Sequence, residues 1–398
     1  MHNLFKIKLF RVLLCITYPF AIIFLYPFVL LKKKNKGHLF FFFDRYAIGG
    51  AQRVHLDILE SVAGMPKELY FTRLSPNEAL KDEFFTLSNC DARDIHFWCD
   101  NLLFRLFTVH YYSLYINRHT KAHVFSSNST FFYDMLFFLK KKVIKTELLH
   151  NFTYGKNGME FFGLANYQYL DHRILVDFAT YNNIANQYKE YGVEERYMQR
   201  VQVIEPGVSV PSAIKKDYSL PLKVLYAGRG TAQKRIYLLN KIADSCIKAA
   251  KPIQFHFAGS MMDELSEYVK EHSVIHGEIS EPAKMNELYD QCHAILMTSS
   301  YEGFPMLIKE GMAHGCVPVV TALEGNKSHL FHSQNALLIS DPANEDHVIA
   351  KGIELLTVLC NNRFELERLS EAAYNYAEIH FDRNKFIKTY NKFLEEHA

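Results

Sequence analysis

Two glutamates, eight positions apart, are the residues of this chain whose types and spacing most suggest chemistry. Glu302 begins a Gly/Pro-containing segment after the apolar run 294–297, which predicts a strand. Glu310 lies within a helix that Pro305 can begin, because proline is tolerated in a first helical turn. One carboxylate would stand at the carboxyl end of a strand, beside the crevice where open α/β sheets bind ligands. Two groups that only accept hydrogen bonds suit a sugar and a ribose, although a solvated glutamate at a helix start would explain either residue alone.

A second candidate site is a glycine-containing loop with two cations. Gly228, Arg229 and Lys234 follow directly on a strand-like run. Arginine offers a bidentate fork to a diphosphate and lysine a point charge, and the helix expected after Lys234 would direct its amino-terminal dipole at the same anion. The loop lacks the P-loop and GxGxxG patterns, so it supports neither a P-loop ATPase nor a dinucleotide enzyme. A surface loop with two solvated cations would have the same sequence.

Three further candidates follow strand-like runs nearer the amino terminus. Gly49 and Gly50 come after the apolar run 38–43, where glycines let a ligand approach the backbone closely; a turn that needs positive φ is the alternative. His150 ends another apolar run, so its ring would face the ligand crevice and could bond a sugar hydroxyl or move a proton. Because the chain has 19 histidines, position rather than residue type singles out His150.

The elements that must position these residues form two series. Short apolar runs alternate with helical patterns, which predicts βαβ units and parallel sheets. We therefore expect an α/β protein with two Rossmann-like domains. The expected parts are an amino-terminal segment 1–36, a Rossmann-like domain 37–205 joined by a carboxyl-terminal helix 378–398, and a second Rossmann-like domain 206–377. In the second series we expect helices over 236–250, 261–271, 282–291 and 305–314, then long helical patterns over 345–360 and 362–394.

Composition excludes several classes of protein. A length of 398 residues suits two domains of ordinary size, and a formal net charge of +2 argues against a general nucleic-acid binder. The seven cysteines include no CxxC pair. Because the number of cysteines is odd, reduced thiols fit better than a disulfide framework. The cysteine spacing of a zinc site is also missing.

The amino-terminal segment is apolar enough to meet a membrane. Residues 12–31 carry no charge, basic residues flank them on both sides, and the run is long enough to span a bilayer. It could be a signal peptide, although no small-residue cleavage site follows. It could be a single spanning helix with the rest of the chain in the cytoplasm. It could also be a monotopic segment in one leaflet, interrupted by Pro19 and Pro27, with Tyr18 and Tyr26 near the headgroups. We expect membrane association at the cytoplasmic face rather than a buried helix, because charge-free runs this long are rarely core helices.

Taken together, these segments resemble a family 4 glycosyltransferase of the GT-B fold. The likeness covers roughly residues 38–395, and Gln52 departs from it by replacing the usual glutamate. Residues 205–209 and 326–328 also depart from the family pattern. The segments that match, in the family's order, are Gly49-Gly50-Ala51-Gln52-Arg53-Val54, His150, Gly228-Arg229 with Lys234, Val274 to Glu278, and Glu302 to Glu310 followed by Gly315-Cys-Val-Pro-Val-Val320.

The resemblance implies a retaining, metal-independent hexosyl transfer from a nucleotide-diphosphate sugar, with no other cofactor. Arg229 and Lys234 would stabilise the departing diphosphate. Glu302 would orient the donor sugar, and His150 would act from the other domain, which would close and exclude water. The residues expected to bind substrate are Gly49, Gly50, Gly228, Ile275, His276, Gly303, Phe304, Pro305 and Glu310.

The expected partners are the donor, a glycan or lipid-linked acceptor and the inner-face membrane, with no nucleic acid. By analogy the acceptor belongs to bacterial surface polysaccharide or lipopolysaccharide synthesis. Lys140, Lys141, Lys142 and Lys145 would suit an anionic headgroup or a pyrophosphate, unless they form a solvated loop that blunts a sheet edge. Two rivals share the architecture: a nucleotide-sugar 2-epimerase-like enzyme, and a catalytically silent membrane-attached scaffold.

Overall fold

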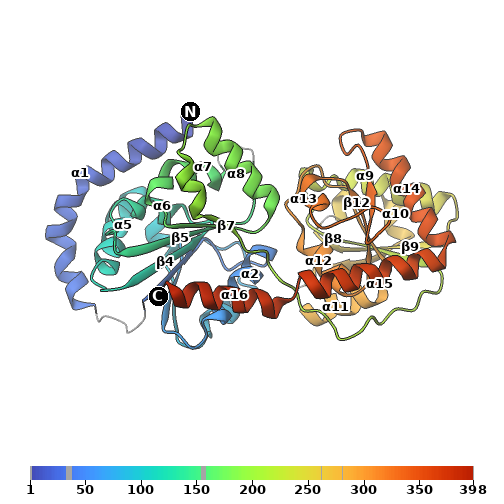
Figure 1. Cartoon of the computed structure of the whole chain (residues 1–398), viewed down its shortest axis with the longest axis horizontal. Helices are drawn as coiled ribbons and strands as arrows, with labels where there is room; N and C mark the ends of the chain where they lie inside the picture. The colour runs from blue at the N-terminus through green and yellow to red at the C-terminus, as the bar shows by residue number, and fades with distance from the viewer. Residues whose placement is uncertain (1, 33–37, 154–157, 261, 280, 398) are drawn as a thin grey trace. The chain divides into compact units, whose positions relative to one another are not determined.

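The structure is a computed structural model that describes residues 2–32, 38–153, 158–260, 262–279 and 281–397. Its internal contacts divide the chain into two compact units (Figure 1). Unit 1 comprises Met1–Glu205 and Ile387–Ala398, and unit 2 comprises Pro206–Phe386. The first division lies at the boundary expected between the two Rossmann-like domains. The segment that returns to unit 1 is shorter than the expected 378–398, because the helix that contains residue 378 belongs to unit 2.

Unit 1 is built on a seven-stranded sheet in the order β3-β2-β1-β4-β5-β6-β7, with every neighbouring pair parallel. The order reverses between β1 and β4, so the carboxyl ends of these two strands mark the topological switch point. All five residues of β1 are buried, as expected of a continuous apolar run covered on both faces. The strands are β1 (Leu39–Phe43), β2 (Lys67–Phe71), β3 (Cys90–Asp94), β4 (Ala122–Ser127), β5 (Val143–Leu149), β6 (His172–Leu175) and β7 (Val201–Val203).

Helices cover both faces of this sheet (Figure 1). Phe40 and Phe42 pack in a cluster with residues of α5 and α6, whereas Phe43 stacks on His55 of α2. The alternation follows from the two-residue period of a strand. The helices of unit 1 are α1 (His2–Leu31), α2 (Gly50–Ser61), α3 (Lys81–Phe85), α4 (His96–Asp100), α5 (Leu102–Ile116), α6 (Thr130–Leu136), α7 (Met159–Asn166) and α8 (Phe178–Glu190), with the end of α16 (Arg383–Glu396).

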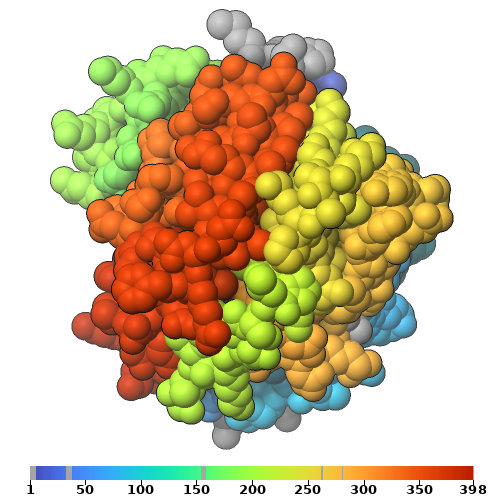
Figure 2. Space-filling model, turned by 90° about the vertical axis from the view of Figure 1, so that its right-hand side faces the viewer, coloured from blue at the N-terminus to red at the C-terminus, as the bar shows by residue number. Residues whose placement is uncertain are grey.

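Unit 2 contains a six-stranded parallel sheet in the order β10-β9-β8-β11-β12-β13. Its order reverses between β8 and β11, which places a second switch point at the ends of those strands. Helices α14 and α15, orange to red in Figure 2, lie across one face of the unit. The strands are β8 (Leu222–Gly228), β9 (Ile253–Gly259), β10 (Val274–Gly277), β11 (Ala294–Met297), β12 (Val317–Thr321) and β13 (Leu337–Ile339). The helices are α9 (Ile236–Lys248), α10 (Glu267–Glu271), α11 (Pro282–Gln291), α12 (Met306–Ala313), α13 (Glu324–Lys327), α14 (Glu345–Asn361) and α15 (Arg363–His380).

The two parallel sheets confirm the expected fold class, and three local expectations were wrong. The pattern over 362–394 forms two helices rather than one. The first, α15, ends at His380, and the Phe381 carbonyl that follows accepts a hydrogen bond from the Val208 amide at 2.7 Å. The expected helix 261–271 is reduced to a short 3₁₀ turn and α10, and Met261 lies outside the described residues. Strands β3 and β13 had not been expected, because three of the five residues of β3 are charged and β13 has only three residues.

Helix α1 is long and apolar enough to cross a membrane. It does not stand apart from unit 1: it packs along α5 and α7 and curves around that side of the unit (Figure 1). Leu14, Ala21 and Val29 are buried on the packed side, while most other apolar side chains of the helix are exposed. The basic residues 33, 34 and 36 of the expected flanking cluster lie outside the described residues.

A buried ion pair joins β5 and β6 inside unit 1. Arg173 Nε lies 2.5 Å from Glu147 Oε2, and both side chains are almost fully buried. Arg173 also donates to the Tyr188 hydroxyl at 3.0 Å, and the Tyr133 hydroxyl donates to Glu147. The charges are therefore neutralised within a closed polar cluster, as buried charges must be.

Candidate active site

Two loops meet at the switch point of unit 2. One starts at Gly228, the last residue of β8, and runs to Lys234, and the other follows β11. The Ser300 amide donates to the Gln233 carbonyl at 2.9 Å, and Gln233 Nε2 donates to the Tyr301 carbonyl at 2.7 Å. Residues nearly 70 positions apart in the chain are thereby held side by side at the edge where open α/β sheets bind ligands.

Lys234 and Glu302 form an ion pair between these two loops. Their side chains are 20% and 11% exposed, so both charges are largely withdrawn from water. The sequence had selected both residues but not their contact. An ammonium group carries three N–H donors, so Lys234 can hold the carboxylate and still donate to a phosphate oxygen.

Gly228 and Arg229 complete the first loop. A side chain at Gly259 would place its Cβ 1.9 Å from the Gly228 carbonyl oxygen, so β8 and β9 approach closely where both strands end. Arg229 is exposed, and its carbonyl accepts a hydrogen bond from the Tyr226 hydroxyl at 3.3 Å. Burial and then the negative charge of Glu302 raise the pKa of Tyr226, so its hydroxyl stays a donor at neutral pH.

Arg235, which sequence reasoning missed, holds the segment that follows β8 in place through hydrogen bonds from its buried side chain. Its backbone has φ 49°, a left-handed conformation that is uncommon for a residue with a side chain. Its buried guanidinium donates to the carbonyls of Thr298 at 2.6 Å, Ser299 at 3.1 Å and Pro342 at 2.7 Å. In the sequence Arg235 follows Lys234 and could not be told from a third solvated cation. Only the structure shows that its side chain joins the segment after β8 to the end of β11.

Gly325 is a second residue that sequence reasoning missed. A Cβ at this position would lie 1.7 Å from the Gly303 carbonyl oxygen and 2.8 Å from that of Glu302. Helix α13 therefore rests directly on the backbone of the Glu302 segment. The sequence contained one signal, because Gly325 directly precedes residues 326–328, which depart from the family pattern.

Glu310, Phe304 and Pro305 occupy α12 and its start. Pro305 caps the helix, which begins at Met306 rather than at the proline itself. Glu310 Oε2 accepts a hydrogen bond of 2.6 Å from the Tyr289 hydroxyl. Burial, and then Glu310, raise the pKa of Tyr289 well above its usual value, so this phenol remains protonated and holds the carboxylate in place. The centre of the Phe304 ring lies 4.6 Å from that of the His329 ring, so Phe304 packs against a neighbouring side chain.

Ile275 and His276 lie on the edge strand β10. Ile275 is exposed. His276 Nε2 is 3.1 Å from His256 Nδ1, and the two rings stack. Burial, followed by the neighbouring His276, lowers the pKa of His256 to about 4. Both imidazoles are therefore neutral at pH 7 and offer hydrogen bonds rather than charge.

The candidates of unit 1 lie at the carboxyl ends of its strands. Gly49 has φ 170°, which is extended backbone, so the turn with positive φ that could have explained it is not seen; Gly50 begins α2. His150 Nε2 is 3.0 Å from Nε2 of His55, a buried residue of α2 that stacks 4.0 Å from the ring of Phe43. Burial lowers the pKa of His150 to about 4, so its ring is neutral at pH 7. His55 was missed because a buried helix position gives no sign of its distant partner.

No group of three or more His, Cys, Asp or Glu side chains is arranged to hold a metal ion within the described ranges. Metal independence stays a prediction, because phosphate oxygens themselves can ligate an ion.

Comparison with known families was made on both sequence and structure. Residues 221–357 match the family model described as glycosyl transferases group 1. This segment lies within unit 2 and contains every candidate residue from Gly228 to Glu310. No curated protein matches the chain significantly.

Several solved structures share the fold at low sequence identity. HepE of Anabaena in complex with UDP is 14% identical, with 90% of this chain and 99% of that chain covered and a TM-score of 0.68. The lipopolysaccharide outer core galactosyltransferase WaaB is 17% identical, with the same coverage and a TM-score of 0.67. TarM is 19% identical over 73% of this chain with a TM-score of 0.57, and the match spans 58% of TarM. These likenesses show the GT-B fold.

Proposed function

We propose that this chain is a glycosyltransferase, because residues 221–357 match the family model described as glycosyl transferases group 1 and the structure has the GT-B fold. From this premise we propose that it moves a hexosyl group from a nucleotide-diphosphate sugar to a glycan or lipid-linked acceptor. The single observation that carries the proposal is the ion pair of Lys234 with Glu302 at the switch point of unit 2.

The diphosphate is the part of the donor that this site is best equipped to hold. Lys234 is kept in place by Glu302 before any ligand arrives, and exposed Arg229 lies on the same loop. Negative charge grows on the diphosphate as the glycosidic bond breaks, and cations fixed in advance stabilise that charge without reorganising. A guanidinium can add two parallel hydrogen bonds to phosphate oxygens.

The carboxylates take the hydroxyl-bearing parts of the donor. Glu310 is oriented by Tyr289 and is assigned to the ribose. Glu302, together with the backbone of Gly303 that α13 holds in place, is assigned to the sugar. Both carboxylates accept hydrogen bonds only, which matches ligands that present rows of O–H donors.

We propose transfer with retention and without a metal ion. The acceptor hydroxyl oxygen bonds to the anomeric carbon on the face that the diphosphate leaves, and the hydroxyl proton departs with the diphosphate. Lys234 and Arg229 supply the positive charge that a divalent ion would otherwise provide. His150 is neutral at pH 7, so it can accept a hydrogen bond from a sugar or acceptor hydroxyl.

The proposed class of acceptor is inferred from helix α1 and from a protein of similar fold, not from the residues of the donor site. Helix α1 presents an apolar surface, and we propose that it lies in the cytoplasmic leaflet of the cell membrane as a monotopic helix. A similar fold is found in a lipopolysaccharide outer core galactosyltransferase. Both points favour a lipid-linked or surface-glycan acceptor.

The first test is transfer from a panel of UDP- and GDP-sugars by Lys234→Ala and Glu310→Ala variants. We expect each to lower kcat/KM by roughly 10²- to 10³-fold, as loss of one preorganised charge-stabilising group does. Lys241→Ala, an exposed lysine of α9, is the matched control and should keep wild-type turnover. Wild-type turnover in both site variants would remove the assignment.

Two further arms separate the rivals. Incubation of a nucleotide sugar alone, without acceptor, would produce an epimer if the chain were an epimerase-like enzyme. Nucleotide binding without transfer to any acceptor of a broad panel would indicate the silent scaffold. Loss of transfer in EDTA, restored by a divalent ion, would contradict the metal-free mechanism.

A further inference from the structure

Helix α1 is attached to unit 1 by polar contacts along most of its length. Arg11 donates to the Asn166 side chain at 2.5 Å, Thr17 lies 2.9 Å from His110 Nε2, and Lys32 pairs with Glu68 at 3.1 Å. Positions 11 and 32 are about 32 Å apart along a helix, which is roughly the thickness of a bilayer core. The helix therefore cannot cross a membrane and keep these contacts.

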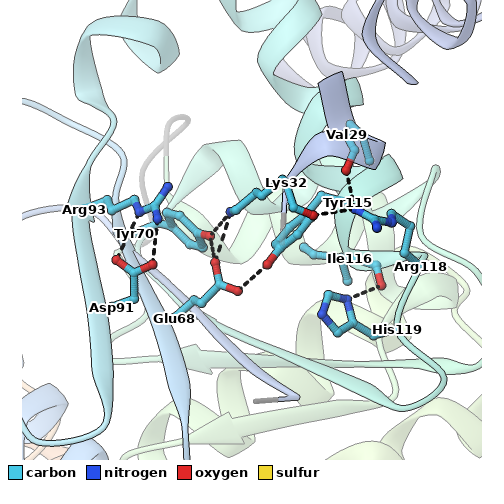
Figure 3. Close-up of polar contacts among 10 residues, drawn as sticks. All are labelled: Val29, Lys32, Glu68, Tyr70, Asp91, Arg93, Tyr115, Ile116, Arg118 and His119. Carbon is cyan, nitrogen blue, oxygen red and sulfur yellow. Dashed lines mark hydrogen bonds and ion pairs between the residues drawn. The ribbon is translucent and has the colours of Figure 1, made fainter. Parts of the chain in front are cut away.

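The carboxyl end of α1 has the strongest attachment (Figure 3). Lys32 Nζ also donates to the Tyr70 hydroxyl at 3.2 Å and lies 3.7 Å from the centre of the Tyr115 ring. The Arg118 guanidinium donates to the carbonyls of Val29 and Lys32, the second at 3.0 Å. Unpaired carbonyls at the end of an apolar helix are thus satisfied by unit 1.

The opposite side of α1 is apolar and bare. No partner within the described part of the chain covers it. A helix packed on a domain by one side, with large apolar side chains on the other, has the shape of a segment that lies in the membrane surface. The exposed apolar side chains are Leu9, Val12, Leu13, Ile16, Phe20, Ile22, Ile23, Phe24, Tyr26, Phe28, Leu30 and Leu31.

A groove of about 600 Å³ runs beside this helix. None of its eight lining residues is acidic, and three are basic: Arg118, Lys140 and Lys142. Both lysines are exposed, and neither forms an ion pair within the residues that the structure describes. The groove is lined by Tyr18, Tyr26, Leu30, Leu114, Asn117, Arg118, Lys140 and Lys142.

The groove lies away from the carboxyl ends of the unit 1 strands, where the candidate residues of that unit lie. Lys140 and Lys142 precede β5, Arg118 precedes β4, and α1 leads toward β1, so all three segments meet the amino-terminal edge of a parallel sheet. His150 follows the carboxyl end of β5. Ligands of open α/β sheets bind at carboxyl ends, so this groove is a separate site.

Lys145 was expected to belong to the same basic patch, and that expectation was wrong. Its side chain is buried, donates to the Val143 carbonyl at 2.5 Å and pairs with Asp171 at 2.9 Å. Lys141 is exposed but does not line the groove. Of the four lysines of the expected patch, only Lys140 and Lys142, two positions apart, line the groove.

We propose that this groove binds the phosphate headgroup of an anionic phospholipid, with its acyl chains against the bare side of α1. The proposal rests on the in-plane helix of the proposed function and is independent of catalysis. Three cations with no carboxylate complement a phosphodiester, Tyr18 and Tyr26 add hydroxyl groups at the depth where such rings gather, and the apolar side chains beside them continue into the hydrocarbon. An apolar helix and a cationic site are the two signals that stable membrane attachment needs.

The test is vesicle sedimentation of the full chain with phosphatidylcholine alone or mixed with phosphatidylglycerol. Each groove lysine contributes about fivefold in partitioning, the equivalent of about 1 kcal/mol near an anionic surface. We expect Lys140→Gln/Lys142→Gln to lower binding to mixed vesicles by about 25-fold and to leave binding to phosphatidylcholine unchanged. Transfer activity on a soluble acceptor should stay at the wild-type level, which separates failure here from failure of the proposed reaction.

Lys141→Gln and Lys142→Gln form the decisive pair, because their charges change equally and their positions are adjacent. A built site predicts a larger loss for Lys142→Gln. Equal losses would show diffuse attraction to the membrane and overturn the proposal. Displacement from mixed vesicles by millimolar inorganic phosphate, with no preference for the lipid, would also overturn it in favour of a free-anion site.

Discussion

Substitution of Gly325 by alanine should damage the donor site through backbone contact alone. The new Cβ would lie 1.7 Å from the Gly303 carbonyl oxygen, whereas ordinary contacts begin at 3.4 Å. The difference, 3.4 − 1.7 = 1.7 Å, must be absorbed by α13 or by the Glu302 segment. Neither neighbour is the end of a flexible side chain, so the backbone that carries Glu302 has to move.

The size of the effect follows from that displacement. A misplacement of about 1 Å in a catalytic group can cost about 10²-fold in rate, so we expect kcat/KM to fall by at least about 10²-fold. Overpacking of this kind costs about 1–3 kcal/mol, and for a domain of this size that corresponds to a Tm lowered by roughly 2–12 °C. Binding of the nucleoside diphosphate should weaken as well, since the Glu302 segment holds Lys234.

The assay compares three quantities in Gly325→Ala and in a matched control: kcat/KM for transfer, the Kd of the nucleoside diphosphate by calorimetry, and Tm. Gly64→Ala is the control, because a Cβ at Gly64 meets nothing within 4 Å. The control should match the wild type in all three. A Gly325→Ala variant with wild-type kcat/KM and Kd would refute the idea that α13 positions the Glu302 segment.

Three other predictions concern unit 1. Arg173→Met leaves Glu147 charged and buried without its partner, so the free energy of unfolding should fall by about 3–5 kcal/mol in urea titrations; a loss under 1 kcal/mol would contradict the buried pair. Burial holds the pKa values of His123 and His150 at about 3 and 4, below the unfolded value of about 6.5. The unfolded state therefore binds more protons below pH 6.5, and stability, complete above that pH, should be lost as pH falls toward 4; a flat unfolding free energy from pH 7.5 to 5 would refute this. Finally, an environment-sensitive dye on exposed Cys15 should report an apolar surrounding with vesicles, quenchable by nitroxide lipids at shallow depth; quenching at the bilayer centre would indicate a spanning helix.

Features that depend on neighbouring residues could be predicted from the sequence. Continuous apolar runs predicted buried parallel strands, because strands covered on both faces lose their polar alternation. Glycines and charged residues at or after the ends of those runs predicted connections at strand ends; Gly228 ends β8, and Lys234 and Glu302 lie in the segments that follow β8 and β11. The same local logic failed where the signal was weak, as in the short strand β13.

Pairings between distant residues were decided only by the tertiary structure. The sequence selected Lys234 and Glu302 separately, but their ion pair depends on β8 and β11 being neighbours in the sheet. His55 was passed over because its partner, His150, lies 95 positions away. The close approach of Gly325 to the Gly303 carbonyl depends on the packing of α13 against that segment.

The environment of a charge was likewise set by the fold. Lys145 and Lys142 are three residues apart in one basic run, yet Lys145 is buried in β5 beside Asp171 and Lys142 is exposed before the strand begins. Composition could show that the first thirty residues prefer an apolar medium. It could not show that α1 packs along unit 1, because that depends on contacts with Asn166, His110 and Glu68, which lie far from it in the chain. Sequence therefore determined which segments are apolar, extended or reactive, and three-dimensional packing decided which of their side chains meet.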